Sequence, residues 1–457
     1  MRKVDQWNAG GSPSDEQDEF VSRPNLSSGV MYEEPVAAGD VESIGVIKAG
    51  ASWVSVGLLQ ISDILGVGLL AMGGAFASLG WILGFVLSIL FAGMCVYLAI
   101  LQWQCQLAYP NAYSQRTLTR EVFQNRGATA FVGITLYLLL FVVCASYLLA
   151  LQQSLSGIFG DIVHLCQYQW TLVSCAILVP TLFLRNLSAL KYLVKLACFL
   201  LVAVVIMVVA FVGVQLANHN DVAGTGTDSI SPTMSMTSFF GGLSNICFAF
   251  CGLPVFLEMS AEMADRNDFP KSFRISVPIE LVLFFLVSVS SYLYQGKDAS
   301  SLLDTIPKGK AMYVAVNVFL FLYMIVAYTI KGIIISRALH IEIWPTTVDE
   351  SGLRPTLQHV FCGTILLVSA FITATAIPVF NLVIQFCGAL FIPLLAYQFP
   401  IVMAFKTRRN LGQTTKLYEL VLWTFIMAFF LMLEIIGTWM NIKSLSTYFS
   451  NNKPFQC

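Results

Sequence analysis

Hydrophobic residues fill long continuous runs of this chain, and short polar segments separate the runs. Eleven runs of about 20 residues are long enough to cross a bilayer as helices. They cover approximately residues 50–79, 80–103, 128–153, 169–184, 191–216, 237–261, 273–295, 310–335, 356–377, 379–405 and 416–440. The pattern predicts an all-α integral membrane protein with eleven transmembrane helices in contact with lipid.

The composition supports this class and excludes others. The chain has 457 residues, of which 57% are hydrophobic and 11% charged, whereas an average soluble domain is about 25% charged. A formal net charge of −1 favours no nucleic-acid partner. Cysteine and histidine spacings typical of a metal site are absent from the sequence. We therefore expect no metal, no cofactor and no enzymatic activity.

The distribution of polar residues divides the chain into three parts. Residues 1–45 are polar and are predicted to form a disordered cytosolic tail. Residues 46–440 form the transmembrane part, and residues 441–457 form a short tail on the outer or lumenal side. Because an aqueous tail and a membrane-embedded part have different solvents, these boundaries follow from the change in composition.

Basic residues predict the orientation. Lys and Arg near span ends favour the cytosolic side. With the N-terminus in the cytosol and eleven spans, 20 of the 25 basic residues lie on the cytosolic side and 5 on the other. Losing one central span would scramble this separation. The C-terminus is therefore expected outside or in a lumen.

The first apolar run is interrupted between Ser62 and Gly74 by one carboxylate and four glycines. A helix in hydrocarbon tolerates interruption only where the freed backbone groups line a protein-enclosed cavity. Gly66 and Gly68 are the expected points of unwinding, since glycine has no Cβ. The alternative is that these small residues only allow close approach of a neighbouring helix.

The sixth run contains a comparable interruption. Gly252 and Pro254 fall near its middle, and proline removes a helical hydrogen bond. Two interrupted spans in corresponding positions indicate an inverted-repeat transporter. The repeats would be about residues 50–216 and 237–405, with 416–440 as an extra helix. An ordinary kink in a packed helix is the alternative.

Two segments resemble a known family. Leu65-Gly-Val-Gly-Leu-Leu70 and Ala75-Phe-Ala-Ser-Leu-Gly-Trp-Ile-Leu-Gly84 are similar to the first-helix signature of the amino acid/auxin permease family. Phe248-Ala-Phe-Cys-Gly-Leu-Pro254, with the later Glu262-Met and Asp268-Phe-Pro-Lys271, resembles its sixth helix and following loop. The resemblance implies an eleven-helix LeuT-like 5+5 inverted repeat with broken helices 1 and 6, within the amino acid–polyamine–cation superfamily.

The resemblance also implies a substrate site between the two breaks. An amino acid's carboxylate would meet amides of the first break, and its ammonium would meet carbonyls at both breaks. These groups recognise the α-amino acid frame. Side-chain selectivity would come from Phe250 and Cys251, from the middle of the third span (Phe141, Ala145) and from the eighth span (Tyr323, Ala327). The expected substrate-binding residues are Ile64, Leu65, Gly66, Val67, Gly68, Phe141, Phe248, Ala249, Phe250, Cys251 and Gly252.

Four other residues are candidates for binding a coupling ion or proton. Asp63 lies deep in the first span, where an unpaired carboxylate costs several kcal/mol and commonly marks an ion path. It could instead cap backbone freed by the break. Lys331 either snorkels to the interface or faces Asp63 in place of a sodium ion. Thr329 is a candidate sodium ligand and Glu258 a candidate gate or relay.

The expected function is secondary active amino acid transport by alternating access. Proton-coupled symport is favoured because Ser62 stands where many sodium-coupled relatives have Asn. Sodium coupling and a transporter-like amino acid sensor are the alternatives. The protein is expected to act as a monomer in the plasma membrane or in a vacuolar or lysosomal membrane.

Overall fold

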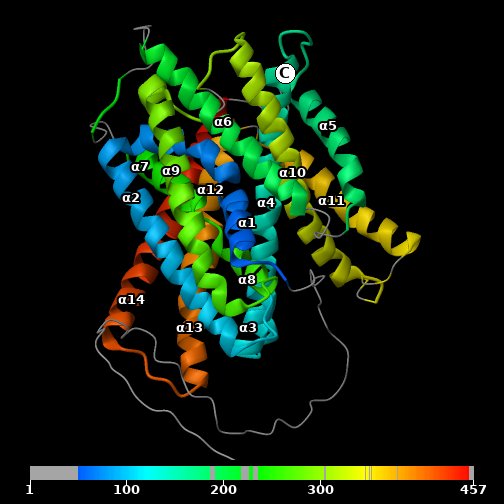
Figure 1. Cartoon of the computed structure of the whole chain (residues 1–457), viewed down its shortest axis with the longest axis vertical. Coiled ribbons are helices and arrows are strands. Elements are labelled where there is room, and N and C mark those ends of the chain that lie inside the picture. The colour runs from blue at the N-terminus through cyan, green and yellow to red at the C-terminus, as the bar shows by residue number, and fades with distance from the viewer. Residues whose placement is uncertain are drawn as a thin grey trace, which may run out of the picture. The chain divides into compact units, whose positions relative to one another are not determined.

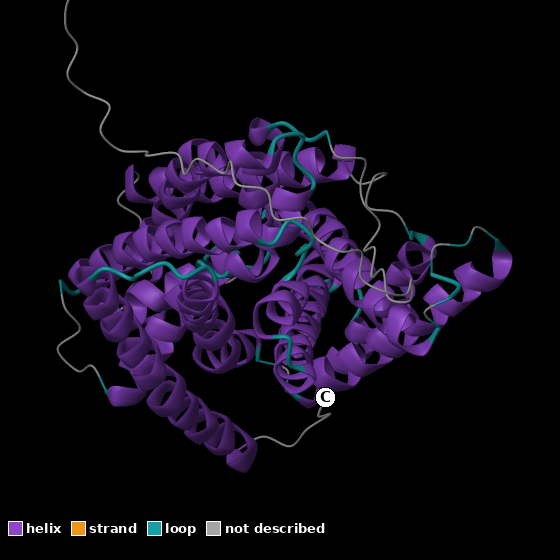
Figure 2. Ribbon diagram, turned by 90° about the horizontal axis from the view of Figure 1, so that it is seen from below, coloured by secondary structure: helices purple, strands orange, loops and turns teal. Residues whose placement is uncertain are grey.

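The computed structural model describes residues 50–185, 191–217, 226–229, 235–302, 305–344, 346–348, 350, 352–377 and 379–451. The predicted tail at residues 1–45 and the last six residues of the chain lie outside this range. The described chain consists of helices and loops, together with one isolated bridge between Ala51 and Met263 (Figure 2). The all-α prediction is confirmed for these residues.

Figure 1 shows the helices in chain order by colour. They are α1 (Trp53–Ile64), α2 (Gly66–Ala108), α3 (Gln115–Phe123), α4 (Arg126–Phe159), α5 (Gln167–Leu178), α6 (Lys191–Ala217), α7 (Met236–Ala249), α8 (Leu253–Ala261), α9 (Phe269–Gln295), α10 (Ala311–Ile343), α11 (Leu353–Ala376), α12 (Phe380–Ile392), α13 (Phe399–Asn410), α14 (Leu417–Met432) and α15 (Thr438–Asn451). A 3₁₀ segment, Val179–Phe183, continues α5. π-Helical turns join α12 to α13 and α14 to α15.

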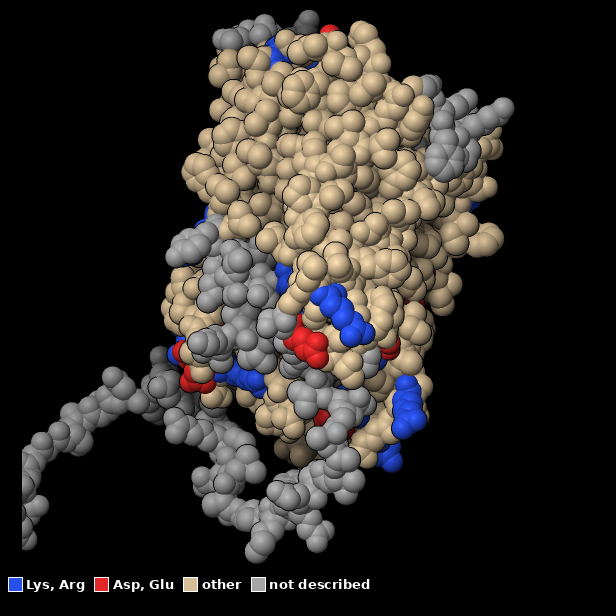
Figure 3. Space-filling model, turned by 90° about the vertical axis from the view of Figure 1, so that its right-hand side faces the viewer, with Lys and Arg blue, Asp and Glu red and all other residues tan. Residues whose placement is uncertain are grey.

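Nine helical stretches of the described chain are long and apolar enough to cross a membrane. The prediction of eleven runs differs in two places. The second half of run one and all of run two form the single 43-residue helix α2, and α5 with its 3₁₀ continuation is too short for the length criterion. On the face in Figure 3, charged side chains gather mainly at the lower end, below a broad uncharged band. The protein is therefore a multi-pass membrane protein.

The α2 helix changes direction at Gly80, whose φ of 82° and ψ of 179° are not helical. Glycine adopts a positive φ without steric cost. The next amides, of Trp81 and Ile82, donate to the carbonyls of Asp228 and Ser229 at 3.2 and 3.0 Å. A helix of 43 residues would be about 65 Å long, twice the thickness of the hydrocarbon core, so this turn lets α2 fold back.

Both predicted breaks are present. The first separates α1 from α2 at Leu65, and the second separates α7 from α8 at residues 250–252. Pro254 is the second residue of α8, where its missing amide hydrogen costs nothing. The expected unwinding at Gly66 and Gly68 is wrong in detail, because both are helical in α2. Their role is close packing, as described below.

We name the two ends of the bundle by the residues found there. The α3 face carries α3, the start of α1 and the end of α8, and it is the lower end in Figure 1. The Gly80 face is the opposite end. The α3 helix itself was not predicted, although Ser114 and Thr117 form a capping box at its start.

Candidate functional site

The first break leaves backbone donors unpaired at the start of α2. The first amides of a helix have no intrahelical acceptor, and those of α2 belong to Gly66, Val67 and Gly68. Leu65 provides no side-chain cap. Since a helix N-terminus also carries partial positive charge, these three amides can bind an anionic group.

The second break presents the opposite polarity. The helix α7 ends at Ala249, and the amides of Phe250 and Cys251 turn back to the carbonyls of Ile246 and Phe248 at 3.3 and 3.1 Å. The remaining carbonyls at this end carry partial negative charge. A Cβ added to Gly68 would stand 2.8 Å from Cα of Ala249. The two breaks are therefore in direct contact.

Two tyrosine hydroxyls cover the first break. A Cβ on Gly66 would stand 2.8 Å from the hydroxyl of Tyr147 and 2.9 Å from that of Tyr323. The Tyr323 hydroxyl also donates to the carbonyl of Ser62 at 3.2 Å. Glycine at position 66 thus allows α4 and α10 to bring polar groups onto the break.

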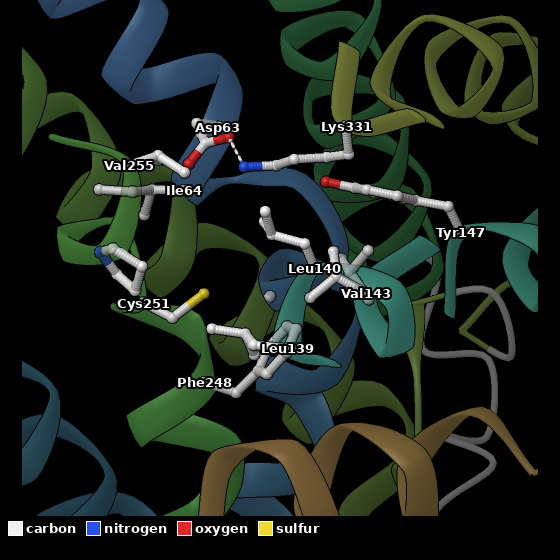
Figure 4. Close-up of a pocket in the computed structure, with 13 residues that line it drawn as sticks. Asp63, Ile64, Leu139, Leu140, Val143, Tyr147, Phe248, Cys251, Val255 and Lys331 are labelled. Carbon is white, nitrogen blue, oxygen red and sulfur yellow. Dashed lines mark ion pairs between the residues drawn. The ribbon is translucent and has the colours of Figure 1, made fainter. Parts of the chain in front are cut away.

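Asp63 and Lys331 form an ion pair beside the break (Figure 4). Their side chains are 12% and 8% exposed. Of the two interpretations of Lys331, the structure shows the ammonium facing Asp63 and not snorkelling toward an interface. Removing only one partner of such a buried pair strongly destabilises the protein, because the other charge is left buried without a partner.

A small central cavity lies between the breaks. Its volume is about 30 Å³, which is enough for about two water molecules. The sulfur of Cys251 points toward the side chains of Leu139 and Phe248 (Figure 4). The lining residues are Asp63, Ile64, Val67, Gly68, Leu139, Leu140, Val143, Tyr147, Phe248, Cys251, Pro254, Val255 and Lys331.

A larger cavity of about 340 Å³ lies toward the α3 face, and we call it the vestibule. The start of α1, the end of α8, and parts of α6 and α10 line it, and Glu258 is among its acidic residues. Asp63, Val255 and Lys331 line both cavities. The ion pair therefore forms part of the partition between the vestibule and the central cavity.

The structure gathers about half of the predicted site residues around these cavities. Those lining the central cavity are Asp63, Ile64, Val67, Gly68, Phe248, Cys251 and Lys331, and Glu258 lines the vestibule. The residues that line neither cavity are Leu65, Gly66, Phe141, Ala249, Phe250, Gly252 and Thr329. Thr329 donates its hydroxyl to the carbonyl of Ile325 at 2.7 Å, within α10.

Sequence reasoning missed Tyr147 and the apolar wall from α4. The wall consists of Leu139, Leu140 and Val143, on the face of α4 that also carries Tyr147. An apolar run contains no periodicity that distinguishes this face from a lipid-facing one. Tyr147 could have been identified from the sequence, because a tyrosine inside an apolar span needs a polar neighbour for its hydroxyl when it is buried.

Comparison with known proteins agrees with this geometry. Residues 49–443 match the family described as transmembrane amino acid transporter protein. The chain belongs to this family. Its relatives include the N amino acid transport system protein of Neurospora crassa, which is 24% identical and aligns over 84% of this chain and 82% of its own length.

Other relatives are similarly distant. The amino acid transporter AVT1D of Arabidopsis thaliana is 24% identical over 84% of this chain and 68% of its own. Vacuolar amino acid transporter 7 of Saccharomyces cerevisiae is 24% identical over 55% and 51%. The fold resembles the crystal structure of MhsT in complex with L-phenylalanine, with a TM-score of 0.53 at 12% identity, over 87% of this chain and 99% of that one.

Proposed function

We propose that this protein is a proton-coupled amino acid symporter that works by alternating access. The observation that carries this proposal is the Asp63–Lys331 pair, which lies between the vestibule and a cavity beside two broken helices. The span count would be eleven, with α1 and the start of α2 as the first and α5 as the fourth. Repeats of five spans would then place the breaks in corresponding positions.

The substrate would bind across the contact between the breaks. Its carboxylate would take the amides of Gly66, Val67 and Gly68, and its ammonium would take carbonyls at the end of α7. The central cavity of about 30 Å³ is too small for an amino acid. Binding therefore requires α4 side chains or one of the half-helices to move away.

Asp63 would carry the coupled proton. Protonation removes its charge and breaks the pair with Lys331, which then lacks a partner at that position. Glu258 interacts electrostatically with Lys331 and lines the vestibule, so it is an alternative acceptor for the ammonium. The partition would open toward the vestibule as the ammonium moves. This order of events links proton binding at Asp63 to the opening of the central cavity toward the vestibule.

Uptake into proteoliposomes tests this proposal. Labelled amino acids are supplied with either a pH gradient or a sodium gradient. We expect uptake with the pH gradient and at least a tenfold loss of this uptake in Asp63→Asn. Sodium-driven uptake, or pH-driven uptake that survives in Asp63→Asn, would contradict the proposal. Binding without uptake under either gradient would indicate a sensor.

A double variant separates coupling from folding. Asp63→Asn alone leaves a buried lysine without its partner, which costs about 3–5 kcal/mol. Asp63→Asn combined with Lys331→Met removes both charges and should recover most of the stability. We expect the double variant to remain uncoupled. Restored pH-driven uptake would assign the loss in the single variant to misfolding.

The α3 face would be cytosolic, in agreement with the distribution of basic residues. The membrane would be vacuolar, lysosomal or plasma. The vacuolar relative from yeast favours an acidic compartment, in which a proton gradient is available.

A further inference from the structure

Another acidic residue, beyond Asp63 and Glu258, lies inside the bundle and takes no part in the mechanism above. Glu280 is on α9, is only 2% exposed, and its Oε1 has no hydrogen-bond partner among the described residues. Native proteins pair nearly all buried polar atoms with protein or water. An unpartnered carboxyl oxygen at this depth therefore requires an explanation.

The packing of α1 and α2 against α9 places Glu280 at the level of Asp63. A Cβ on Gly57 would stand 3.1 Å from the carbonyl of Ser272, and a Cβ on Gly73 would stand 2.8 Å from Cβ of Ser291. The difference in residue number between the two contacting positions is nearly the same in both contacts, so α9 runs parallel to the segment formed by α1 and the start of α2. At this offset, Asp63 is level with Glu280.

Gln60 occupies the α1 face that turns toward α9. It follows Gly57 by three residues and therefore lies on the same face, one turn further along. The side chain of Gln60 is completely buried, and neither its Nε2 nor its Oε1 has a partner among the described residues. By the same offset, Gln60 is level with Ser276, which precedes Glu280 by one turn and interacts with its carboxyl.

The charged and titratable groups around Glu280 do not neutralise it. Glu280 interacts electrostatically with Asp63 of α1 and with Cys95 of α2. The ammonium of Lys331 is paired with Asp63. The ion pairs formed by the described residues include none with Glu280.

An isolated buried carboxylate is so costly that the group takes up a proton instead. A glutamine amide has both a hydrogen-bond donor and an acceptor. Gln60 can therefore form a hydrogen bond with the Glu280 carboxyl group whether that group is protonated or not. We propose that Glu280, assisted by Gln60, forms a second proton-binding site on the α9 side of Asp63. This inference rests on the proposed function for its role in transport, namely that two protons move with each substrate.

The number of protons per substrate tests the proposal. It is obtained in proteoliposomes from the opposing substrate gradient that stops net flux at a known proton gradient. We expect two protons per substrate in the wild type and one in Glu280→Gln. Glu434→Gln is the matched control, because Glu434 is an intramembrane acid that already accepts a hydrogen bond from Gln398 at 2.9 Å. An unchanged ratio in Glu280→Gln would overturn the inference.

Infrared spectroscopy of the purified full-length protein gives a readout that needs no transport. A protonated carboxylic acid has a carbonyl-stretch band distinct from that of a carboxylate. In the Asp63→Asn background, Glu280→Gln should remove one such band, and Gln60→Leu should shift it. Failure to remove a band contradicts a proton on Glu280. A band that sodium removes at constant pH would instead indicate a sodium site.

These readouts distinguish the two proposals. If the wild type shows no proton-driven uptake but Glu280→Gln removes the band, the proposed function fails and the second site remains. If uptake is proton-driven but Glu280→Gln changes neither the number of protons per substrate nor the carboxylic acid band, only the proposed second site is contradicted.

Discussion

Gly66 illustrates how a single residue determines the geometry of this site. Sequence reasoning selected it as a point of unwinding, since glycine is easily unwound. In the structure it is helical, and its missing side chain makes room for the hydroxyls of Tyr147 and Tyr323. A sequence shows that a residue is small, but it does not show which neighbour uses the space.

Gly66→Ala should therefore impair transport through a steric clash. Inserting a methyl group into a packed interior costs about 1–3 kcal/mol, so we expect about a tenfold loss of apparent substrate affinity in uptake assays. Adding Tyr147→Phe should partly restore it, because one of the two hydroxyls is then gone. Gly93→Ala is the control, since a Cβ there meets nothing within 4 Å. Equal effects of the two glycine variants would argue against this explanation.

The ion pair gives a second prediction at the scale of residues. Asp63→Asn and Lys331→Met should each lower the thermal stability of the detergent-solubilised protein, whereas the double variant should lose much less than the sum. The reason is that each single change leaves one buried charge. A double-mutant cycle measures this coupling. Additive losses would show that the two side chains do not depend on each other.

At the scale of elements, both helix breaks could be predicted, because Pro254 and the cluster of glycines in the first run have direct backbone consequences. The first break lies at Leu65, one residue before Gly66 and three before Gly68, because both glycines pack closely within α2. The apolar wall of α4 could not be predicted. Lipid-facing and cavity-facing residues are equally hydrophobic in a membrane protein.

A short loop segment, residues 226–229, packs on the Gly80 face. The Asp228 amide donates to the hydroxyl of Tyr292 at 2.9 Å, and Lys297 pairs with the Asp228 carboxylate at 2.8 Å. The Tyr292 ring also packs on Trp81, with centroids 4.7 Å apart. These contacts join the loop to α9 and to the part of α2 that follows Gly80.

Tyr292→Phe should loosen this face. The variant loses the hydrogen bond that the hydroxyl accepts from the Asp228 amide and the longer one, 3.4 Å, that it donates to the Asp228 carbonyl. Together these cost about 1–2 kcal/mol, which corresponds to about a 5- to 30-fold increase in the open population. Hydrogen exchange of the amides of Trp81 and Ile82 should become faster by the same factor, because they donate to the loop carbonyls. Tyr168→Phe, at an exposed tyrosine, should leave these amides unchanged. Unaltered exchange in Tyr292→Phe would show that the loop is held by other contacts.

At the scale of the whole molecule, composition predicted the class and the family motifs predicted the transporter fold. Basic residues predicted an orientation that depends on the number of spans. Labelling of introduced cysteines tests it. The described native cysteines that are free are all buried or half-buried, so background labelling should be low.

Leu411→Cys and Ile162→Cys should be labelled from opposite sides of the membrane. Leu411 follows α13 and Ile162 follows α4, and both are more than half exposed. In intact cells or sealed organelles with known sidedness, a membrane-impermeant maleimide should reach position 411 only from the cytosol and position 162 only from the other side. Labelling of both from one side would exclude the proposed arrangement of spans.

The partition between the two cavities has a kinetic consequence. Only Asp63, Val255 and Lys331 are shared by both cavities, so on this side the barrier is about one side chain thick. Rotamer changes of such groups take nanoseconds when unhindered, whereas collective helix movements take microseconds to milliseconds. The opposite side contains the buried aromatic ring of Phe76, which packs on Trp81 and Phe85. Opening of the Gly80 face should therefore limit the turnover rate, and exchange between the central cavity and the vestibule should be the fast, temperature-insensitive step of the cycle.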